Sequence, residues 1–280
     1  MGSIKCLPIF ISLVFATALS SHAQTPPKPA PTPPRSLEHD FLKNILRDQK
    51  AIWTAPLQVE RGDAKWVIPS SIGFLALIAT DRTTGDEISE TNGQIGASRR
   101  ISYAGSIYGL GAVAGGFYLL GRKTNNYRAR ETGVLSAEAL VDSVIVSGAL
   151  KEITQRGRPA TGVERSEFFE GGNSFPSGHS TQAWAVATVI ANEYKHRRAV
   201  QITAYGIATA VSVARFTGQK HYLSDVVAGS ALGFAIGRYV YSAHRRVEQN
   251  PGITSSAWPR ITPELNRQTR RYGLALTWNF

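Results

Sequence analysis

Cysteine is almost absent from this chain of 280 residues. The single cysteine, Cys6, lies in an N-terminal apolar segment, so the rest of the sequence offers neither a disulfide framework nor a thiolate metal site. Acidic residues are also few, because 20 Asp and Glu stand against 31 Lys and Arg and give a formal net charge of +11. This charge favours an anionic partner, but it does not distinguish nucleic acid, anionic lipid and a phosphorylated substrate.

Charge-free apolar runs that are long enough to cross a bilayer are equally scarce. Only the stretch 101–121 meets the roughly 20 residues that a spanning helix needs. Basic clusters lie at 122–130, 195–198 and 245–246. If successive helices crossed a membrane in alternating directions, all three clusters would lie on the same side of it. Each cluster also follows an expected helix C-terminus, where cations match the helix dipole. A membrane-spanning bundle and a water-soluble one therefore both stay open.

The first 36 residues are predicted to be an export signal and a spacer. Lys5 precedes an apolar run from Cys6 to Leu19, and Ser21-His22-Ala23 has the small-x-small pattern of a cleavage site. We therefore predict a signal peptide over 1–23, with an uncleaved membrane anchor as the alternative. Residues 24–36 are predicted to be a linker, since six of the 14 prolines fall between Thr25 and Arg35 and proline excludes a helix.

The next part of the chain is predicted to be all-α. Apolar stretches rich in small residues alternate with charged loops, which is typical of a helical bundle. About six helices are expected, over 66–80, 101–121, 133–150, 180–192, 199–214 and 226–237. The helical domain is expected over 37–246. A tail over 247–280 ends in alternating apolar residues, which predict a short C-terminal strand or hairpin.

Three segments place unusual polar residues at the ends of these helices. The first runs from Lys151 to Pro159, and the spacing of Lys151 and Arg158 predicts that both cations lie on one helical face, about two turns apart. Two converging cations suit a dianionic phosphate. A solvated basic turn would give the same pattern.

The second segment, from Phe175 to His179, opens an apolar helix. Ser177 suits a helix start, and Gly178 lacks a side chain that would block approach to the backbone, so the first N–H groups can bind an anion. His179 would then lie beside the anion. The alternative is an ordinary helix cap with an incidental histidine.

The third segment contains Arg215, His221 and Asp225. The histidine and the aspartate are four residues apart, so on one helical turn the carboxylate can accept a hydrogen bond from one ring nitrogen and leave the other as a nucleophile. A surface His–Asp pair is the alternative.

Together, Lys-x6-Arg-Pro, Pro-Ser-Gly-His and Arg-x5-His-x3-Asp resemble the three-part signature of the type 2 phosphatidic acid phosphatase and haloperoxidase superfamily. The resemblance implies a helical bundle like that of acid phosphatases and vanadium haloperoxidases. It implies that His221 attacks phosphorus and forms a phosphohistidine, that Asp225 orients His221, and that His179 protonates the leaving group. The residues implied to hold the phosphoryl oxygens are Lys151, Arg158, Ser177, Gly178 and Arg215.

The implied activity is hydrolysis of phosphomonoesters or pyrophosphates, foremost those of lipids, without a metal or another cofactor. The expected partners are a phosphorylated lipid or a small phosphate ester and a membrane. Nucleic acid is not expected, because the basic residues lack an aromatic stacking platform, and no obligate protein partner is inferred. The alternatives are a vanadate-dependent haloperoxidase on the same scaffold and a non-catalytic envelope protein that binds anionic lipid.

The expected location is a bacterial-type cell envelope, with the active site facing the periplasm. A soluble periplasmic protein is the alternative. If the signal is cleaved and all three expected helices before Lys151 cross the membrane, the catalytic end lies in the cytoplasm, opposite to the side that the basic clusters indicate. One of these three helices is therefore expected not to cross the membrane. The stretch 66–80 is short and contains Pro69, so we expect it to lie at the interface or on the bundle.

Overall fold

The computed structural model describes residues 37–58, 60–86, 92–159, 167–244, 260–266 and 271–277. The predicted signal peptide and linker, and the basic pair 245–246, lie outside the described residues. The described helical part is all-α, as predicted. Its α-helices are α2 (Phe41–Thr54), α3 (Ala64–Asp86), α4 (Asn92–Ala104), α5 (Ile107–Lys123), α6 (Tyr127–Thr154), α7 (Gly178–Glu193), α8 (Arg198–Thr217) and α9 (Leu223–His244).

The single helix expected over 101–121 is wrong, because the chain breaks between α4 and α5. Ser106 caps the new helix by accepting a hydrogen bond from the N–H of Gly109 at 3.2 Å. Gly105, just before this cap, lies so close to Val211 of α8 that an added methyl group would collide with it. The sequence contains the cap and the glycine, but the helix against which Gly105 packs lies far along the chain, at Val211.

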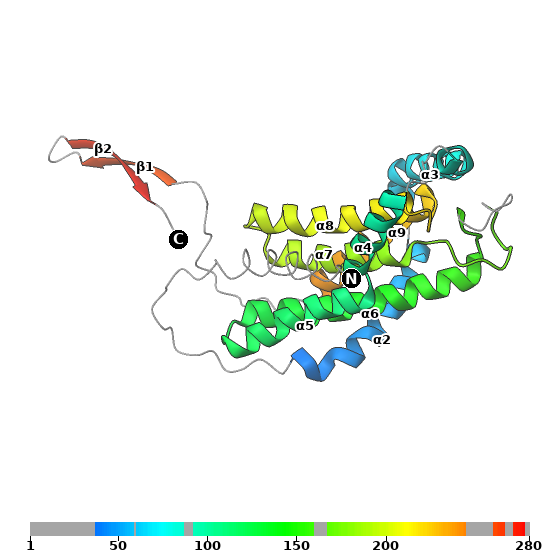
Figure 1. Cartoon of the computed structure of the whole chain (residues 1–280). Helices are drawn as coiled ribbons and strands as arrows, with labels where there is room; N and C mark the ends of the chain where they lie inside the picture. Colours follow the sequence, from blue (N-terminus) through cyan, green and yellow to red (C-terminus); the bar gives the residue numbers. More distant parts are fainter. Residues whose placement is uncertain are drawn as a thin grey trace. The chain divides into compact units, whose positions relative to one another are not determined.

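Helix α7 lies at the centre of the bundle. It packs against α6, α8 and α9, and Figure 1 shows α6, α7 and α8 running side by side. Three glycines of α9, Gly229, Gly233 and Gly237, let α7 and α9 approach closely, because a methyl group at any of them would collide with a backbone carbonyl oxygen of α7 or of its cap. The α9 backbone is thereby held against the start of α7, where the second motif lies.

Two acidic residues of α6 are buried within the bundle and receive hydrogen bonds from α2. Asn44 donates to Glu138 at 2.9 Å, and Gln49 donates to Asp142 at 2.8 Å. A buried carboxylate without such donors would strongly destabilise the fold. Helix α2 therefore provides one hydrogen-bond donor to each of these two acidic residues.

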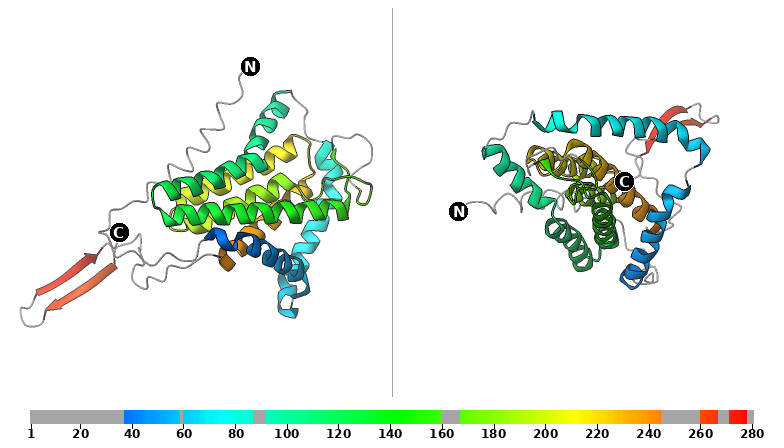
Figure 2. Two further views of the ribbon diagram at one scale, coloured as in Figure 1. Left: turned by 90° about the horizontal axis from the view of Figure 1, so that it is seen from below. Right: turned by 90° about the vertical axis from the view of Figure 1, so that its right-hand side faces the viewer.

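All three motifs lie at one end of the bundle. The C-termini of α6 and α8 and the N-termini of α7 and α9 meet there because consecutive helices alternate in direction. Figure 2 shows α3 lying across the bundle at this end rather than along it. Two described stretches have the length and hydropathy of membrane spans, Gly93–Lys123, which contains the α4–α5 break, and Tyr127–Thr154.

The C-terminal hairpin forms a separate unit. Strand β1 (Arg260–Asn266) pairs antiparallel with β2 (Arg271–Thr277), and Arg260 lies opposite Thr277 in the register. The aromatic residues at 278 and 280, on which the strand pattern ended, lie outside the described residues.

Candidate active site

Lys151 and Arg158 converge in space, but they do not share a helical face. Helix α6 ends at Thr154, and Gln155 adopts a left-handed conformation with φ 45°, so Arg158 lies in the following loop. Asn173 joins the two cations: its carbonyl oxygen accepts a hydrogen bond from Lys151 Nζ at 2.6 Å, and its side-chain oxygen accepts one from Arg158 Nε at 2.8 Å. The predicted pairing is present, but a loop residue brings it about.

The start of α7 faces the Lys151 side chain. Ser177 is the N-cap of α7, and a Cβ at Gly178 would lie 3.7 Å from Lys151 Cε. The Ser177 N–H donates to the Asp225 carbonyl at 3.0 Å, while the Ser177 hydroxyl accepts from Ser180 at 3.0 Å and keeps its own hydrogen to donate. The N–H groups of Gly178 and His179 belong to the first helical turn, where no intrahelical acceptor exists. This end of α7 can therefore bind an anion.

His221 is held by a backbone carbonyl rather than directly by Asp225. It precedes α9, and its side chain is buried. Its Nδ1 lies 2.8 Å from the Ser174 carbonyl oxygen and 3.7 Å from Asp225 Oδ2, which is too long for a hydrogen bond. A carbonyl can only accept, so the proton is on Nδ1 and the lone pair is on Nε2. The expected direct histidine–carboxylate hydrogen bond is thus replaced by the Ser174 carbonyl.

Burial keeps His221 neutral near neutral pH. Burial lowers the pKa of His221 to about 4, and the neighbouring carboxylate of Asp225 only partly opposes this effect. Burial, followed by the charge of Arg215, likewise lowers the pKa of His179 to about 4. Both imidazoles are therefore uncharged in the free protein at neutral pH.

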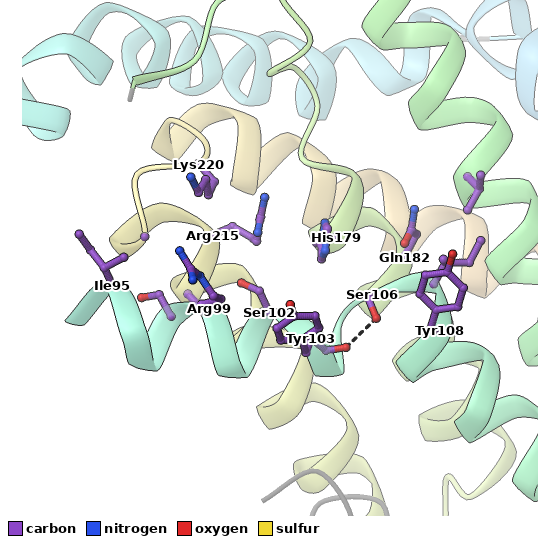
Figure 3. A pocket seen from close by; sticks show the side chains of 15 residues that line it. Ile95, Arg99, Ser102, Tyr103, Ser106, Tyr108, His179, Gln182, Arg215 and Lys220 are labelled. Carbon is purple, nitrogen blue, oxygen red and sulfur yellow. Dashed lines mark hydrogen bonds between the residues drawn. The ribbon is translucent and has the colours of Figure 1, made fainter. Parts of the chain in front are cut away.

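Arg215 is a cation with unused hydrogen-bonding capacity. Its Nε is buried and has no hydrogen-bond partner among the described residues. Burial, and after it the charge of Arg158, lowers the pKa of Arg215 to about 10, which still leaves the guanidinium charged at neutral pH. Arg215 and His179 line a cavity of about 560 Å³ (Figure 3). An anion in this cavity would supply the acceptor that Arg215 lacks.

A buried charge network behind His221 was not foreseen from the sequence. Arg156 is completely buried and donates to Asp225 at 2.6 Å, to Asp81 of α3 at 2.7 Å and to Ser224 at 2.7 Å. The Asp225 carboxylate also accepts from the Ser174 hydroxyl at 2.5 Å. The network thus runs from α3 to the residue whose carbonyl holds His221.

Two aromatic rings cover the Arg156 guanidinium. Its central carbon lies 4.8 Å from the ring centroid of Phe168 and 4.6 Å from that of Tyr222, so both contacts are cation–π interactions. Arg156 lies inside the first motif, between Lys151 and Arg158, where it could have been noticed. No pattern in the sequence points to Asp81.

The three motifs converge at one end of the helical bundle, and one family model matches the part of the chain that carries them. Residues 132–249 match the model of the PAP2 superfamily. The match begins within α6 and includes every residue of the three motifs.

Three similar proteins carry phosphatase names. The chain is 36% identical over 70 residues to a lipid A 1-phosphatase of Porphyromonas gingivalis, covering 25% of this chain and 16% of that protein. It is 34% identical over 120 residues to phosphatidylglycerophosphatase B of Bacillus subtilis, covering 39% of this chain and 57% of that protein. A PA-phosphatase related-family protein of Dictyostelium discoideum is 28% identical over 145 residues, which is 45% of this chain and 52% of that protein. The chain thus spans less than two thirds of each of these curated relatives.

A solved structure is also similar. It is the crystal structure of a transmembrane PAP2 type phosphatidylglycerolphosphate phosphatase from Bacillus subtilis, with 20% sequence identity and a TM-score of 0.47, covering 76% of this chain and 99% of that one.

Proposed function

We propose that this domain hydrolyses phosphate esters or pyrophosphates of lipids through a phosphohistidine on His221. The observation that carries the proposal is the hydrogen bond from His221 Nδ1 to the Ser174 carbonyl at 2.8 Å. It fixes the proton on Nδ1 and leaves the Nε2 lone pair for attack on phosphorus. The match of residues 132–249 to the PAP2 superfamily model and the phosphatase names of the relatives support the same reaction.

In the first step Nε2 of His221 forms a bond to phosphorus and the ester oxygen leaves. His179 donates a proton to the leaving oxygen. A bound phosphate dianion raises the pKa of a neighbouring histidine, so substrate binding itself would charge His179. In the second step His179 removes a proton from water, the water oxygen attacks phosphorus, and phosphate departs from His221.

The charge that develops on the phosphoryl oxygens is stabilised by fixed donors. Lys151 and Arg158 are placed through Asn173, and Arg215 offers its unpaired Nε. The Ser177 hydroxyl and the Gly178 N–H complete the set at the start of α7. Donors fixed in advance of the reaction cost no reorganisation when charge develops.

The proposed reaction requires no metal, and this can be tested directly. We expect an excess of EDTA to leave phosphate release unchanged, whereas orthovanadate should compete with substrate, because the pentacoordinate vanadate bound to His221 would resemble the transition state. Phosphate release from a panel of lipid and soluble esters measures both effects. Loss of activity with EDTA and its recovery with a divalent ion would contradict the proposal.

Assays of the same preparation separate the two alternatives. Halide oxidation by peroxide after loading with vanadate would identify a haloperoxidase. Binding of anionic lipid without turnover of any ester would identify a non-catalytic envelope protein.

We further propose that the domain is associated with a membrane and that its active site faces the periplasm. Exposed cations gather at the end of the bundle opposite the motifs, with Arg122 and Lys123 at the α5–α6 turn and Lys195 and Arg197 at the α7–α8 turn. Cytoplasmic loops of membrane proteins carry such an excess of Lys and Arg. The crosswise position of α3 (Figure 2) supports the expectation that this helix does not span the membrane.

Cysteine labelling can test this orientation in a Cys6→Ser background. In intact spheroplasts, a thiol probe that does not cross the inner membrane should label Glu170→Cys, near the motifs, but not Lys123→Cys, at the opposite end. Both side chains are exposed, whereas Gly172 is unsuitable because an added Cβ would collide with the Arg156 backbone. Labelling at both positions would favour a soluble periplasmic protein, and labelling at Lys123→Cys alone would reverse the orientation.

A further inference from the structure

The cavity beside His179 extends well beyond the motif residues. From His179 and Arg215 it continues along α4 and the start of α5. Figure 3 shows Arg99, Arg215 and Lys220 gathered on one side of His179, and Gln182 and Tyr108 on the other side. Two of these cations, Arg99 and Lys220, have no role in the proposed reaction.

Helix α4 is hydrogen-bonded to the C-terminal residue of α8, close to the third motif. Gln94 donates a hydrogen bond to the Thr217 carbonyl at 3.0 Å, and the hydroxyls of Ser98 and Thr217 are 3.0 Å apart. Thr217 lies between Arg215 and Lys220 in the sequence. The α4 side of the cavity is therefore held in place relative to the phosphate site. Arg99 directly follows Ser98, one of the two α4 residues that bond to Thr217.

The cation-rich side of the cavity has no matching negative charge. Among the described residues that line the cavity none is acidic, and in the described part of the chain neither Arg99 nor Lys220 forms an ion pair. Arg215, between them, has the unpartnered Nε. Three cations that face one cavity favour an anion between them.

We propose that Arg99 and Lys220 bind a second anionic group of the substrate, next to the phosphoryl group that is transferred. This inference rests on the proposed phosphatase function and adds the substrate class: an amphiphile with two negatively charged groups at its head. The second group could be the other phosphate of a diphosphate or an anion attached through a short linker. Tyr103, Ile107 and Val144 line the same cavity and would contact the carbon portion of the substrate.

Binding of non-hydrolysable probes tests the subsite without turnover. We expect the full chain in detergent micelles to bind methylenediphosphonate or its longer propylene homologue at least about tenfold more tightly than inorganic phosphate, the gain typical of one added charge-assisted hydrogen bond. The double variant Arg99→Gln/Lys220→Gln should lose this gain. Isothermal titration calorimetry measures it, and the preferred spacer distinguishes a diphosphate from a linked anion.

The matched control is the double variant Arg100→Gln/Lys195→Gln. It removes the same charge from two exposed residues that do not line the cavity. This control should still bind the diphosphonates more tightly than inorganic phosphate, as the wild type does. The proposal is overturned if phosphate and both diphosphonates bind equally to the wild type. It is also overturned if the preference survives in Arg99→Gln/Lys220→Gln or is lost equally in the control.

Turnover gives an independent readout. The measured quantity is the kcat/KM for a long-chain alkyl diphosphate divided by the kcat/KM for the alkyl monophosphate. This ratio should fall about tenfold in Arg99→Gln/Lys220→Gln and stay constant in the control. An unchanged ratio in Arg99→Gln/Lys220→Gln would contradict the subsite. If the wild type hydrolyses no ester, the proposed phosphatase function fails, and the calorimetric comparison still decides whether the subsite exists.

Discussion

Replacing His221 with alanine or asparagine should reduce phosphate release from every substrate by a factor of about a thousand or more, because the nucleophile is removed. Asparagine is the more informative replacement, because it removes the nucleophile but can keep a hydrogen bond to the Ser174 carbonyl. Its amide N–H can donate to the Ser174 carbonyl as Nδ1 does at 2.8 Å, so the buried carbonyl keeps a partner and the fold is disturbed least. Initial rates of phosphate release measure the loss, and circular dichroism checks that the variants are folded.

A trapping experiment shows whether the lost function is nucleophilic. The wild type, quenched during turnover of a substrate with a labelled phosphoryl group, should carry label that is released by acid and retained in alkali, as expected of a phosphohistidine. His221→Asn should carry none. The control His196→Gln alters an exposed histidine of the α7–α8 turn and should behave as the wild type. Near-normal turnover by His221→Ala on any substrate would exclude His221 as the nucleophile.

His179 should act on the leaving group, and its variant should therefore depend on leaving-group chemistry. His179→Ala is expected to slow hydrolysis of an alkyl phosphate much more than that of a nitrophenyl phosphate, whose leaving group needs no proton. Equal losses on both esters would assign His179 to phosphate binding instead.

Local patterns predicted the positions of α3, α6, α7, α8 and α9, but not α2 or the break between α4 and α5. The start of α7 at Gly178 behind the Ser177 cap follows from the Pro-Ser-Gly sequence. The contacts that join the motifs in space could not be predicted from local sequence patterns. Lys151 and Arg158 meet through Asn173, and His221 is oriented through Ser174; both partners lie in a loop whose position depends on the whole bundle.

The contribution of α3 is the clearest case of information that the sequence does not show. Asp81 lies in an ordinary helical stretch, more than 70 residues before its partner Arg156. Its carboxylate also accepts a hydrogen bond from the Ser224 N–H at 3.0 Å. A buried carboxylate needs these donors, but nothing local identifies which distant residues provide them.

Replacing Arg156 with methionine should produce the largest loss of stability among the variants considered for this chain. Arg156 is the buried cation between two buried carboxylates, at 2.6 Å from Asp225 and 2.7 Å from Asp81. Removing one partner of a buried ion pair typically lowers the free energy of unfolding by about 3–5 kcal/mol. Arg156→Lys should lose less, because it keeps the charge, although an ammonium group cannot bridge both carboxylates as the planar guanidinium does. Denaturant unfolding followed by circular dichroism measures both changes.

The same network should position the active site, and a pH profile separates this role from stability alone. Burial raises the pKa of Asp225, but the neighbouring His221 and Arg156 outweigh this effect and hold it below its usual value. Arg156→Lys keeps a positive charge but cannot bridge both carboxylates, so its weaker pairing should raise the pKa of Asp225 and move the acid limb of kcat/KM to higher pH. Asp81→Asn should lower kcat by misplacing Arg156. The control Arg82→Gln, which removes an exposed ion pair to Glu167, should change stability by less than about 1 kcal/mol and leave the profile in place. If Arg156→Lys and Asp81→Asn keep both the wild-type kcat and the wild-type acid limb, the network stabilises the fold without positioning His221.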